Sequence, residues 1–324
     1  MTNPPPALPT LPAGAAAHLA DFEDPAILGA SRQIATANKL FVALVQEHPG
    51  SPEEVLGDLR AVAAYLIAQR GASTQAIPNA LAQMLAGSAA WADLPPTKFR
   101  QQALRALGGY LDRSSRDRDR VTEIGVTVAA TARRLLAYDY SSSVAAILAR
   151  LGTTATRPTV VIPEARSLNG GRRFVEELAS TGLTIEFVPD AALSSLLQSC
   201  DLALIGAETV GADGSCYNTV GSLGVALACN FWRVPLYVPT TLIKIDTRTL
   251  WGYQRPSPPL HGSRLYGLTA GWSASDQARV QVVSPDLDAV PARFISGFIT
   301  EAGVLPPAAI SLHAARLAED LNDV

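Results

Sequence analysis

The chain has 324 residues, of which 48% are hydrophobic and 17% are charged. A chain of this length and composition can bury a large core and is long enough for two domains. Its net charge of −3 gives no electrostatic case for binding nucleic acid, so nucleic-acid partners are not expected.

The cysteines and histidines indicate neither a disulfide framework nor a metal site. Cys200, Cys216 and Cys229 are odd in number and form no C-x-x-C pair, so a reducing cytoplasm is the expected location. The four histidines are scattered and no H-E-x-x-H motif occurs, so we expect no metal. No apolar run is long enough to span a membrane, and the N-terminus does not have the pattern of a secretory signal.

The first part of the chain has helical periodicity. Residues 1–24 are rich in Pro and Ala and are predicted to form a loose tail. Residues 25–130 are predicted to form an all-helical domain, because apolar side chains recur at helix spacing and no strand-like alternation appears. Ser51-Pro52-Glu53-Glu54 has the form of a capping box at the start of one of these helices.

Residues 131–324 have a different pattern, in which short apolar runs alternate with helical ones. The expected strands are Arg134–Tyr138, Thr159–Pro163, Leu183–Val188, Leu202–Gly206 and Leu236–Pro239. The expected helices between them are Ser142–Leu151, Gly171–Thr181, Ala191–Ser199 and Val220–Asn230. This alternation predicts an α/β fold with a Rossmann-like parallel sheet.

Ligands of such sheets bind where the strands end, and four loops leave those ends. They are Asp139–Ser143, Glu164–Gly171, Ala207–Asn218 and Thr240–Asp246. No G-x-G-x-x-G motif follows the first strand, so neither a dinucleotide nor any other cofactor is expected.

The four loops, in this order, resemble those of one superfamily. Residues 201–246 contain GAE, NTVGS, VPTT and KID, which are similar to the family's G-A-D/E, N-K/R-I/V-G-T/S, V-P-x-x-V and K-F/I-D segments. EARSLNGGRRFVEEL, LLAYDYSSSVAAIL and FITEAGVLPPAAI are similar to its other loops and its C-terminal segment. The family comprises methylthioribose-1-phosphate isomerase, ribose-1,5-bisphosphate isomerase and the alpha, beta and delta subunits of eukaryotic translation initiation factor 2B. The resemblance covers about residues 25–315.

The isomerases of this family convert an aldose 1-phosphate to a ketose, and the resemblance implies a catalytic cysteine and a catalytic aspartate. In this chain the cysteine position is Asp139 and the aspartate position is Glu208. The two carboxylates could form an acid/base pair, because such a reaction needs one group to give and one to accept a proton. Two alternatives stay open: the pocket binds without catalysis, or Asp139 only caps the following helix. Cys216 lies in the third loop, but no neighbouring residue supplies a base to activate it.

A phosphate would be held by cations and by the start of a helix. Asn218, Gly221 and Ser222 open the helix after the third loop, where backbone N–H groups converge. Thr219 stands where relatives carry Lys or Arg, and Leu28 where active relatives have Arg before Gly-Ala. The further candidates for binding the substrate or its phosphate are Arg166, Lys244, Asp246 and Arg32.

The leading prediction is a sugar-phosphate-handling enzyme of the aldose–ketose isomerase type, an intramolecular oxidoreductase. The alternative is a non-catalytic regulatory protein that binds a sugar phosphate or nucleotide, as in the initiation factor 2B alpha subunit; a translation factor ranks third. The resemblance also implies a homodimer. Residues 248–285 are rich in aromatic residues and proline and could form a lid, a dimer contact or a plain surface loop.

Overall fold

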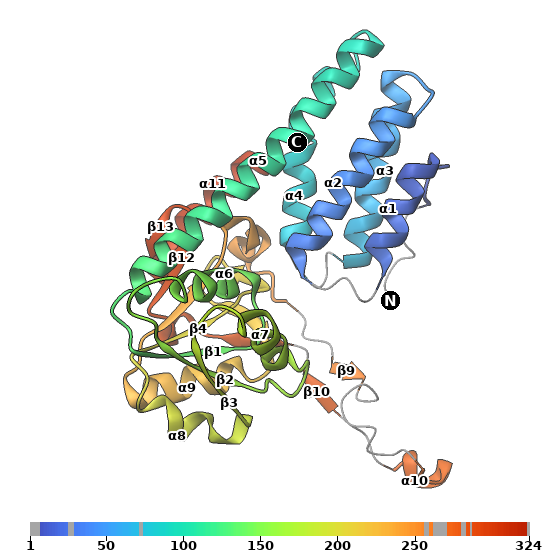
Figure 1. The fold of residues 1–324 in the computed structure, drawn as a ribbon. Helices are drawn as coiled ribbons and strands as arrows, with labels where there is room; N and C mark the ends of the chain where they lie inside the picture. Colours follow the sequence, from blue (N-terminus) through green and yellow to red (C-terminus); the bar gives the residue numbers. More distant parts are fainter. Residues whose placement is uncertain are drawn as a thin grey trace. The chain divides into compact units, whose positions relative to one another are not determined.

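The computed structural model describes residues 7–24, 29–70, 74–255, 259–261, 271–279, 283–285 and 287–322. The chain divides into two compact units (Figure 1). The helical unit comprises residues 1–117, 243–247 and 312–324, and the α/β unit comprises residues 118–242 and 248–311. The predicted division at residue 130 differs from this one in two ways: α5 (Pro96–Ala129) runs through both units, and residues 243–247 and 312–324 group with the helices.

The helical unit consists mainly of helices from the first part of the chain. They are α1 (Ala13–Glu23), α2 (Ala30–Glu47), α3 (Pro52–Arg70), α4 (Ala76–Met84), the short η1 (Ser88–Trp91) and the first part of α5. The loose tail predicted for residues 1–24 is therefore wrong for residues 13–23, because Ala15 and Phe22 of α1 are fully buried in the core of this unit. Leu8 was expected to be loose as well, but it packs against the same core.

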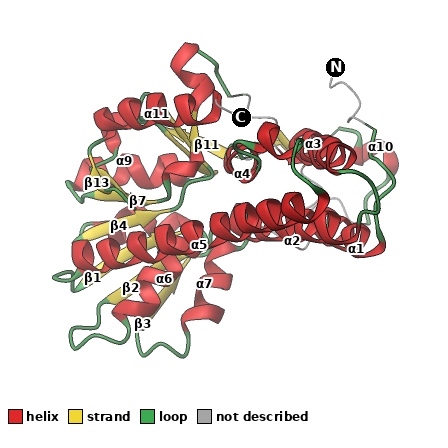
Figure 2. Ribbon diagram, turned by 90° about the horizontal axis from the view of Figure 1, so that it is seen from above, coloured by secondary structure: helices red, strands yellow, loops and turns green. Residues whose placement is uncertain are grey.

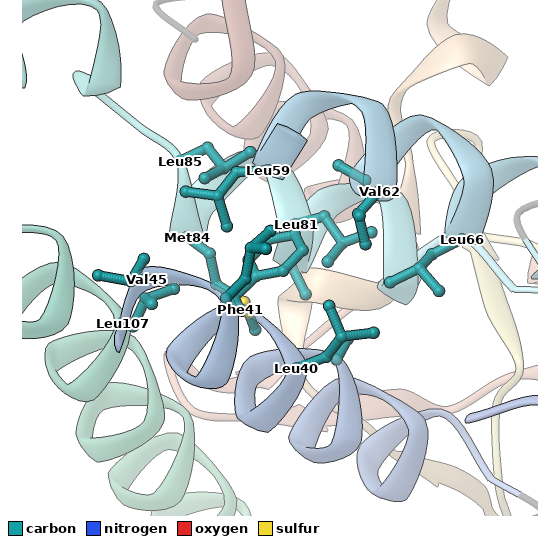
Figure 3. Close-up of a cluster of buried hydrophobic side chains, with 14 of the residues drawn as sticks. Leu40, Phe41, Val45, Leu59, Val62, Leu66, Leu81, Met84, Leu85 and Leu107 are labelled. Atoms are coloured by element: carbon teal, nitrogen blue, oxygen red, sulfur yellow. The ribbon is translucent and has the colours of Figure 1, made fainter. Parts of the chain in front are cut away.

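The core of the helical unit follows the predicted apolar spacing. The buried face of α3 and its partners from the other helices interdigitate in Figure 3, which labels Leu40, Phe41, Val45, Leu59, Val62, Leu66, Leu81, Met84, Leu85 and Leu107. The capping box is confirmed: Ser51 N–H donates to Glu54 Oε2 (2.7 Å) and Glu54 N–H donates to Ser51 Oγ (3.3 Å).

A short segment from late in the sequence also belongs to the helical unit. The Asn79 side-chain amide of α4 donates to the carbonyls of Ile243 (2.8 Å) and Ile245 (2.9 Å). These bonds attach the end of η3 (Leu242–Lys244) and β8 (Ile245–Asp246) to the helices, and Asp246 is only 1% exposed.

The α/β unit contains a seven-stranded sheet of order β13-β12-β7-β4-β1-β2-β3 (Figure 2). All of its neighbouring strands are parallel except β12 and β13. Its strands are β1 (Arg134–Tyr138), β2 (Thr159–Pro163), β3 (Thr184–Val188), β4 (Leu202–Ile205), β7 (Leu236–Pro239), β12 (Gly297–Thr300) and β13 (Gly303–Leu305). The predicted α/β class with a Rossmann-like parallel sheet is confirmed.

Helices pack along this sheet because its strands are apolar. They are the end of α5, α6 (Ser142–Leu151), α7 (Gly170–Leu178), η2 (Asp190–Ala192), α8 (Leu193–Leu197) and α9 (Ser222–Trp232). One cluster joins the end of α5, α6 and α7 to alternate residues of the strands, including Leu135, Val160 and Leu204. The strands therefore stay fixed while their end loops remain available for a site.

The third loop is more ordered than predicted. It contains the hairpin of β5 (Thr209–Gly211) and β6 (Cys216–Thr219), and β6 pairs on its other side with β11 (Leu287–Val290). In that ladder Asp288 lies opposite Asn218, and Leu287 lies opposite Thr219. A strand from far along the chain is thus attached directly beside the expected site.

The rest of the described chain consists of short elements and one last helix. These are η4 (Thr247–Trp251), β9 (Pro259–His261), α10 (Ala274–Gln277), β10 (Val283–Pro285), η6 (Ala292–Phe294), η7 (Pro307–Ala309) and α11 (Ile310–Asn322). Of the aromatic stretch 248–285, Pro256, Pro258 and Tyr266 lie outside the described residues, as does Leu28, while Trp251 is 73% exposed. Among the described residues, no helix has the length and apolar composition needed to cross a membrane.

Candidate functional site

Asp139 directly follows β1 and is the first residue of the first loop. Its φ is 54°, in the left-handed region, and the residue is only 6% exposed. The helix cap is a different residue: Ser141 is the N-cap of α6, and its hydroxyl accepts from Val144 N–H at 3.5 Å. The alternative in which Asp139 merely caps this helix is therefore wrong.

The surroundings of Asp139 alter its acidity. Burial raises the pKa of its carboxyl from 3.8 to about 6. Hydrogen bonds from the Thr219 hydroxyl and the Tyr140 backbone N–H lower the pKa, whereas the negative charges of Glu208 and Asp190 raise it. A carboxyl with this pKa exchanges its proton close to neutral pH.

The first turn of α7 approaches the same carboxyl group. A Cβ atom on Gly170 would lie 1.9 Å from Asp139 Oδ1, and one on Gly171 would lie 1.9 Å from the carbonyl oxygen of Pro163. Both glycines are buried. Only residues without a side chain allow the helix to start this close to the ends of β1 and β2.

Glu208 reaches the same region from the end of β4. Its backbone N–H donates to the carbonyl of Tyr217 (2.8 Å), which begins the β5–β6 hairpin, and the residue is half-buried. The charge of Glu208 raises the pKa of Asp139, so the two carboxylates of the predicted acid/base pair interact electrostatically.

Asn218 and Ser222 are bonded to each other. Asn218 Nδ2 donates to Ser222 Oγ (2.9 Å), and this hydroxyl donates to the carbonyl of Thr219 (2.7 Å). Ser222 is fully buried and Asn218 is 5% exposed. The Ser222 hydroxyl therefore stabilises the turn into α9, while the predicted role of Ser222 in binding phosphate rests on the backbone N–H groups at the helix start.

The start of α9 already holds an anion, which sequence reasoning missed. Asp288 Oδ2 accepts from the N–H groups of Gly221 (2.8 Å) and Leu223 (3.0 Å). Gly221 has a φ of 103°, and a Cβ on it would lie 1.8 Å from the Tyr138 hydroxyl oxygen. The prediction that Gly221 offers its N–H to a phosphate is corrected, because a carboxylate of the chain occupies that donor and would repel a second anion.

Arg166 stands in the second loop beside another unforeseen carboxylate. The N–H groups of Ala165 and Arg166 donate to the two oxygens of Asp190, both at 2.9 Å. Ala165 is fully buried with a φ of 47°, so this acceptor helps to hold a strained backbone. The Arg166 guanidinium is 57% exposed, and its Nη1 lies 3.9 Å from Glu164 Oε2.

The other predicted binding residues, Arg32, Lys244 and Asp246, lie in the helical unit. Arg32 is exposed on α2, Lys244 is partly exposed, and Asp246 is buried in β8. The α/β unit thus supplies the two carboxylates of the predicted pair, while most of the predicted cations come from the helical unit.

The third loop also contains Cys216, one of the three cysteines. The Cys216 thiol is fully buried and lies 3.6 Å from the carbonyl oxygen of Gly206. Within the described ranges, no group of three or more His, Cys, Asp or Glu side chains is arranged to hold a metal ion.

The family follows from comparison with known proteins. Residues 28–307 match the family model described as the Initiation factor 2 subunit family, IF-2B. The chain belongs to this family. The resemblance carried by the four strand-end loops is confirmed.

Curated relatives in the family are named as sugar-phosphate isomerases. The methylthioribose-1-phosphate isomerase of Thermosynechococcus vestitus is 30% identical over 162 residues, which are 49% of this chain and 43% of that protein. The ribose 1,5-bisphosphate isomerase of Haloferax volcanii is 23% identical over 279 residues, which are 85% of this chain and 83% of that protein. The chain thus spans less than half of the first relative and most of the second.

Solved structures show the same fold. The translation initiation factor eIF-2B of Pyrococcus horikoshii has a TM-score of 0.74 at 19% identity, covering 92% of this chain and 98% of the other. The 5-methylthioribose 1-phosphate isomerase of the same organism has a TM-score of 0.76 at 18% identity, covering 95% and 88%. Both an isomerase and a translation factor therefore share this architecture.

Proposed function

We propose that this family member acts on a phosphorylated sugar as an aldose–ketose isomerase, with Asp139 and Glu208 as its acid and base. The observation that carries the proposal is the buried Asp139 carboxyl, whose pKa of about 6 is raised by burial and, to a smaller degree, by neighbouring Glu208. The names of the curated relatives support the reaction class.

The pair can perform both proton transfers that the reaction needs. As the sugar ring opens, the protonated carboxyl gives its proton to the ring oxygen while the bond from that oxygen to carbon 1 breaks. The ionised carboxylate takes the proton of carbon 2, and the released electrons form a double bond between carbons 1 and 2. Return of that proton to carbon 1, and loss of the hydroxyl proton on carbon 2 to the first group, gives the ketose and restores both carboxyls.

The phosphate is proposed to meet cations instead of the start of α9. Asp288 already occupies the donors of Gly221 and Leu223. Arg166 is the candidate in the α/β unit; Arg32 and Lys244, which belong to the helical unit, are each a separate candidate for binding the phosphate. Asp246 is proposed to accept from a sugar hydroxyl, and Asn218 to shape the turn beside Asp139.

The test is turnover and thermal stabilisation with a panel of pentose and hexose phosphates. Wild type is compared with Asp139→Asn and Glu208→Gln for catalysis, and with Arg166→Ala and Lys244→Ala for phosphate binding. We expect turnover to fall by about 100-fold or more in the carboxyl variants, the usual contribution of a general acid or base. Turnover that survives both carboxyl substitutions would rule out the acid/base pair. Thermal stabilisation that survives both cation substitutions would show that the phosphate binds at other residues.

The second candidate is a regulatory protein that binds a sugar phosphate or nucleotide without converting it. The replacement of the implied cysteine by Asp139 and of the usual cation by Thr219 favours it. Ligand-induced stabilisation of wild type with no turnover across the panel would select this candidate.

A homodimer through the α/β unit is proposed as well. Leu227 (49% exposed) and Phe231 (74%) are four residues apart and so form one apolar face on α9. A related solved structure is titled a tetrameric eIF2B-beta2-delta2 complex. Light scattering should give a dimer for wild type and a monomer for Phe231→Glu. Phe187→Glu, at an exposed aromatic residue of edge strand β3, is the matched control and should remain dimeric.

The proposed compartment is the cytoplasm. All three cysteines are free thiols, and all are buried, as expected for a chain kept in a reducing environment. Fractionation of cells that express the full chain with a terminal tag tests this location.

A further inference from the structure

We propose that Asp288 is a positioning residue of this site, which holds the turn between β6 and α9 so that the Thr219 hydroxyl reaches Asp139. The inference goes beyond the acid/base pair, and it rests on the proposed function only in taking Asp139 as the reacting carboxyl. Asp288 itself touches backbone atoms of the turn and is not assigned a catalytic role.

Asp288 accepts hydrogen bonds from the turn that directly follows Thr219. It comes from β11, where it lies opposite Asn218 in the ladder with β6. From there Oδ2 accepts from Gly221 N–H at 2.8 Å and from Leu223 N–H at 3.0 Å. One carboxylate thus holds both the N-cap residue of α9 and the first turn of that helix.

Tyr138, at the end of β1 in the seven-stranded sheet, binds the same turn. Its hydroxyl donates to the carbonyl of Val220 at 2.8 Å, and Val220 immediately precedes Gly221. Burial, followed by the negative charges of Asp190, Asp139 and Asp288, raises the pKa of Tyr138, which keeps its hydroxyl protonated as a donor. Tyr138 is the residue before Asp139, so the turn is fixed relative to β1 itself.

The contacts of Asp288 and Tyr138 restrict the position of Thr219. It is 4% exposed, and its hydroxyl donates to the Asp139 carboxyl. Because Asp288 and Tyr138 hold the backbone directly after Thr219, the Thr219 side chain has little freedom to leave that carboxyl. Loss of the Asp288 contacts should therefore loosen Thr219 first and remove a bond that favours ionised Asp139.

The direction in which the pKa of Asp139 shifts when Asp288 is replaced distinguishes a positioning role of Asp288 from a direct effect of its charge. The groups that face Asp139 are Thr219 and the Tyr140 N–H, which lower its pKa, and Glu208 and Asp190, which raise it. Removing a negative charge at position 288 could only lower the pKa of Asp139. Loosening Thr219 would raise it, so the two explanations predict shifts of opposite sign.

The experiment follows the side-chain carboxyl carbon of Asp139 by NMR in protein labelled with carbon-13 aspartate. The signal is assigned by its loss in Asp139→Asn. Asp288→Ala should move the titration midpoint of Asp139 to higher pH. Asp288→Asn keeps an oxygen that can accept from Gly221 and Leu223, and it should return the midpoint to the wild-type value or below.

The matched control is Asp201→Ala. Asp201 also accepts from two backbone N–H groups, those of Arg133 and Arg134, but at the opposite edge of the sheet, so its loss should leave the Asp139 midpoint in place. If Asp288→Ala fails to fold, Asp288→Ser is titrated instead, since its side chain is too short for both contacts. An unchanged or lowered midpoint in the Ala or Ser variant overturns the inference.

The same variants distinguish this inference from the isomerase proposal. The NMR titration does not need turnover, so a wild type without activity would defeat the isomerase proposal and leave the positioning test intact. If wild type is active, the acid limb of kcat/KM should shift with the NMR midpoint in Asp288→Ala. Activity with no movement of either would defeat the positioning role alone.

Discussion

The strands of the seven-stranded sheet begin at one edge and end at the other, and an aspartate at each of these two edges has its pKa shifted in a different direction. At the edge where β1 begins, Asp201 accepts from the N–H groups of Arg134 and Arg133, and these bonds hold its pKa below the usual range. At the edge where β1 ends, burial raises the pKa of Asp139 to about 6. The same residue type is thus stabilised as an anion at one edge and made reluctant to ionise at the other.

The backbone differs between the edges in the same sense. Asp139, Ala165 and Asn169, in the loops after β1 and β2, all have a φ near 50°, which costs energy for a residue with a side chain. At the opposite edge Arg134 donates through Nη1 to Glu186 Oε1 (2.9 Å) and through Nη2 to Oε2 (2.5 Å). Three of the four non-glycine residues with a positive φ that the structure describes lie where the site is proposed, while the fourth, Arg233, precedes β7 at the opposite edge. The Arg134–Glu186 pair makes two hydrogen bonds, whereas the ion pair near the site, Arg166 with Glu164, is 3.9 Å long.

The largest effect should come from Gly221→Ala at the proposed site. A Cβ there would lie 1.8 Å from the buried Tyr138 hydroxyl oxygen, on a backbone with a φ of 103°. Clash and strain together should lower the free energy of unfolding by roughly 2–6 kcal/mol. Chemical denaturation measures it, with Gly224→Ala in the same helix as control. Gly224 has open space around its Cβ position, so alanine there should stabilise by about 0.5–1 kcal/mol; equal effects at both positions would contradict the contrast.

The second effect is a gain in stability from Asp139→Asn above pH 7. Because the folded-state pKa is raised from 3.8 to about 6, ionisation favours the unfolded chain. The stability associated with this group is full below about pH 4 and is lost as the pH rises through 6. Asp139→Asn should therefore be more stable than wild type at pH 8 by up to roughly 3 kcal/mol, with little difference at pH 4.

Asp201→Asn is the matched experiment at the other edge, with the opposite sign. Its folded-state pKa is lowered, so it contributes stability above its unfolded pKa that is lost as the pH falls. Asp201→Asn should destabilise at pH 8 and matter less under acid conditions. Parallel pH profiles for the two variants would remove the distinction between the edges.

A smaller effect is expected from Asp190→Ala. This change removes the acceptor of the Ala165 and Arg166 N–H groups, at a cost of about 1–3 kcal/mol. It also takes a negative charge away from Asp139, whose NMR titration midpoint should move to lower pH. A midpoint that rises or stays fixed would show that Asp190 does not act on the Asp139 carboxyl.

The smallest effect should be that of Glu186→Gln at the opposite edge. Its partner Arg134 is 25% exposed and Glu186 is 37% exposed, so solvent screens the pair. We expect a loss of about 0–1 kcal/mol, measured by denaturation at low and high salt. A loss in the free energy of unfolding comparable to that of Gly221→Ala would mean that this edge tolerates substitution no better than the proposed site.

The sequence alone determined the class of fold, the family and the carboxylates of the proposed site. Local patterns are sufficient for these: apolar runs of strand length give β1, β2 and β4, and Ser51 with Glu54 gives a cap whose two hydrogen bonds join residues three positions apart. Asp139 and Glu208 could be named because the family resemblance places them where relatives carry the catalytic cysteine and aspartate. Pattern reading failed for residues 13–23, since only tertiary burial of Phe22 shows that this stretch is a helix.

Only the tertiary structure decided what those carboxylates meet. Asp288 and Gly221 are 67 residues apart, and Asn79 and Ile243 are 164 apart, so no local pattern links either pair. The start of α9 is predicted from sequence to be an anion site. Its N–H donors are in fact occupied by Asp288, which lies on β11, a strand from a distant part of the chain. The acidity of Asp139 is likewise set by burial and by charges from other loops, which have no signature in the sequence around it.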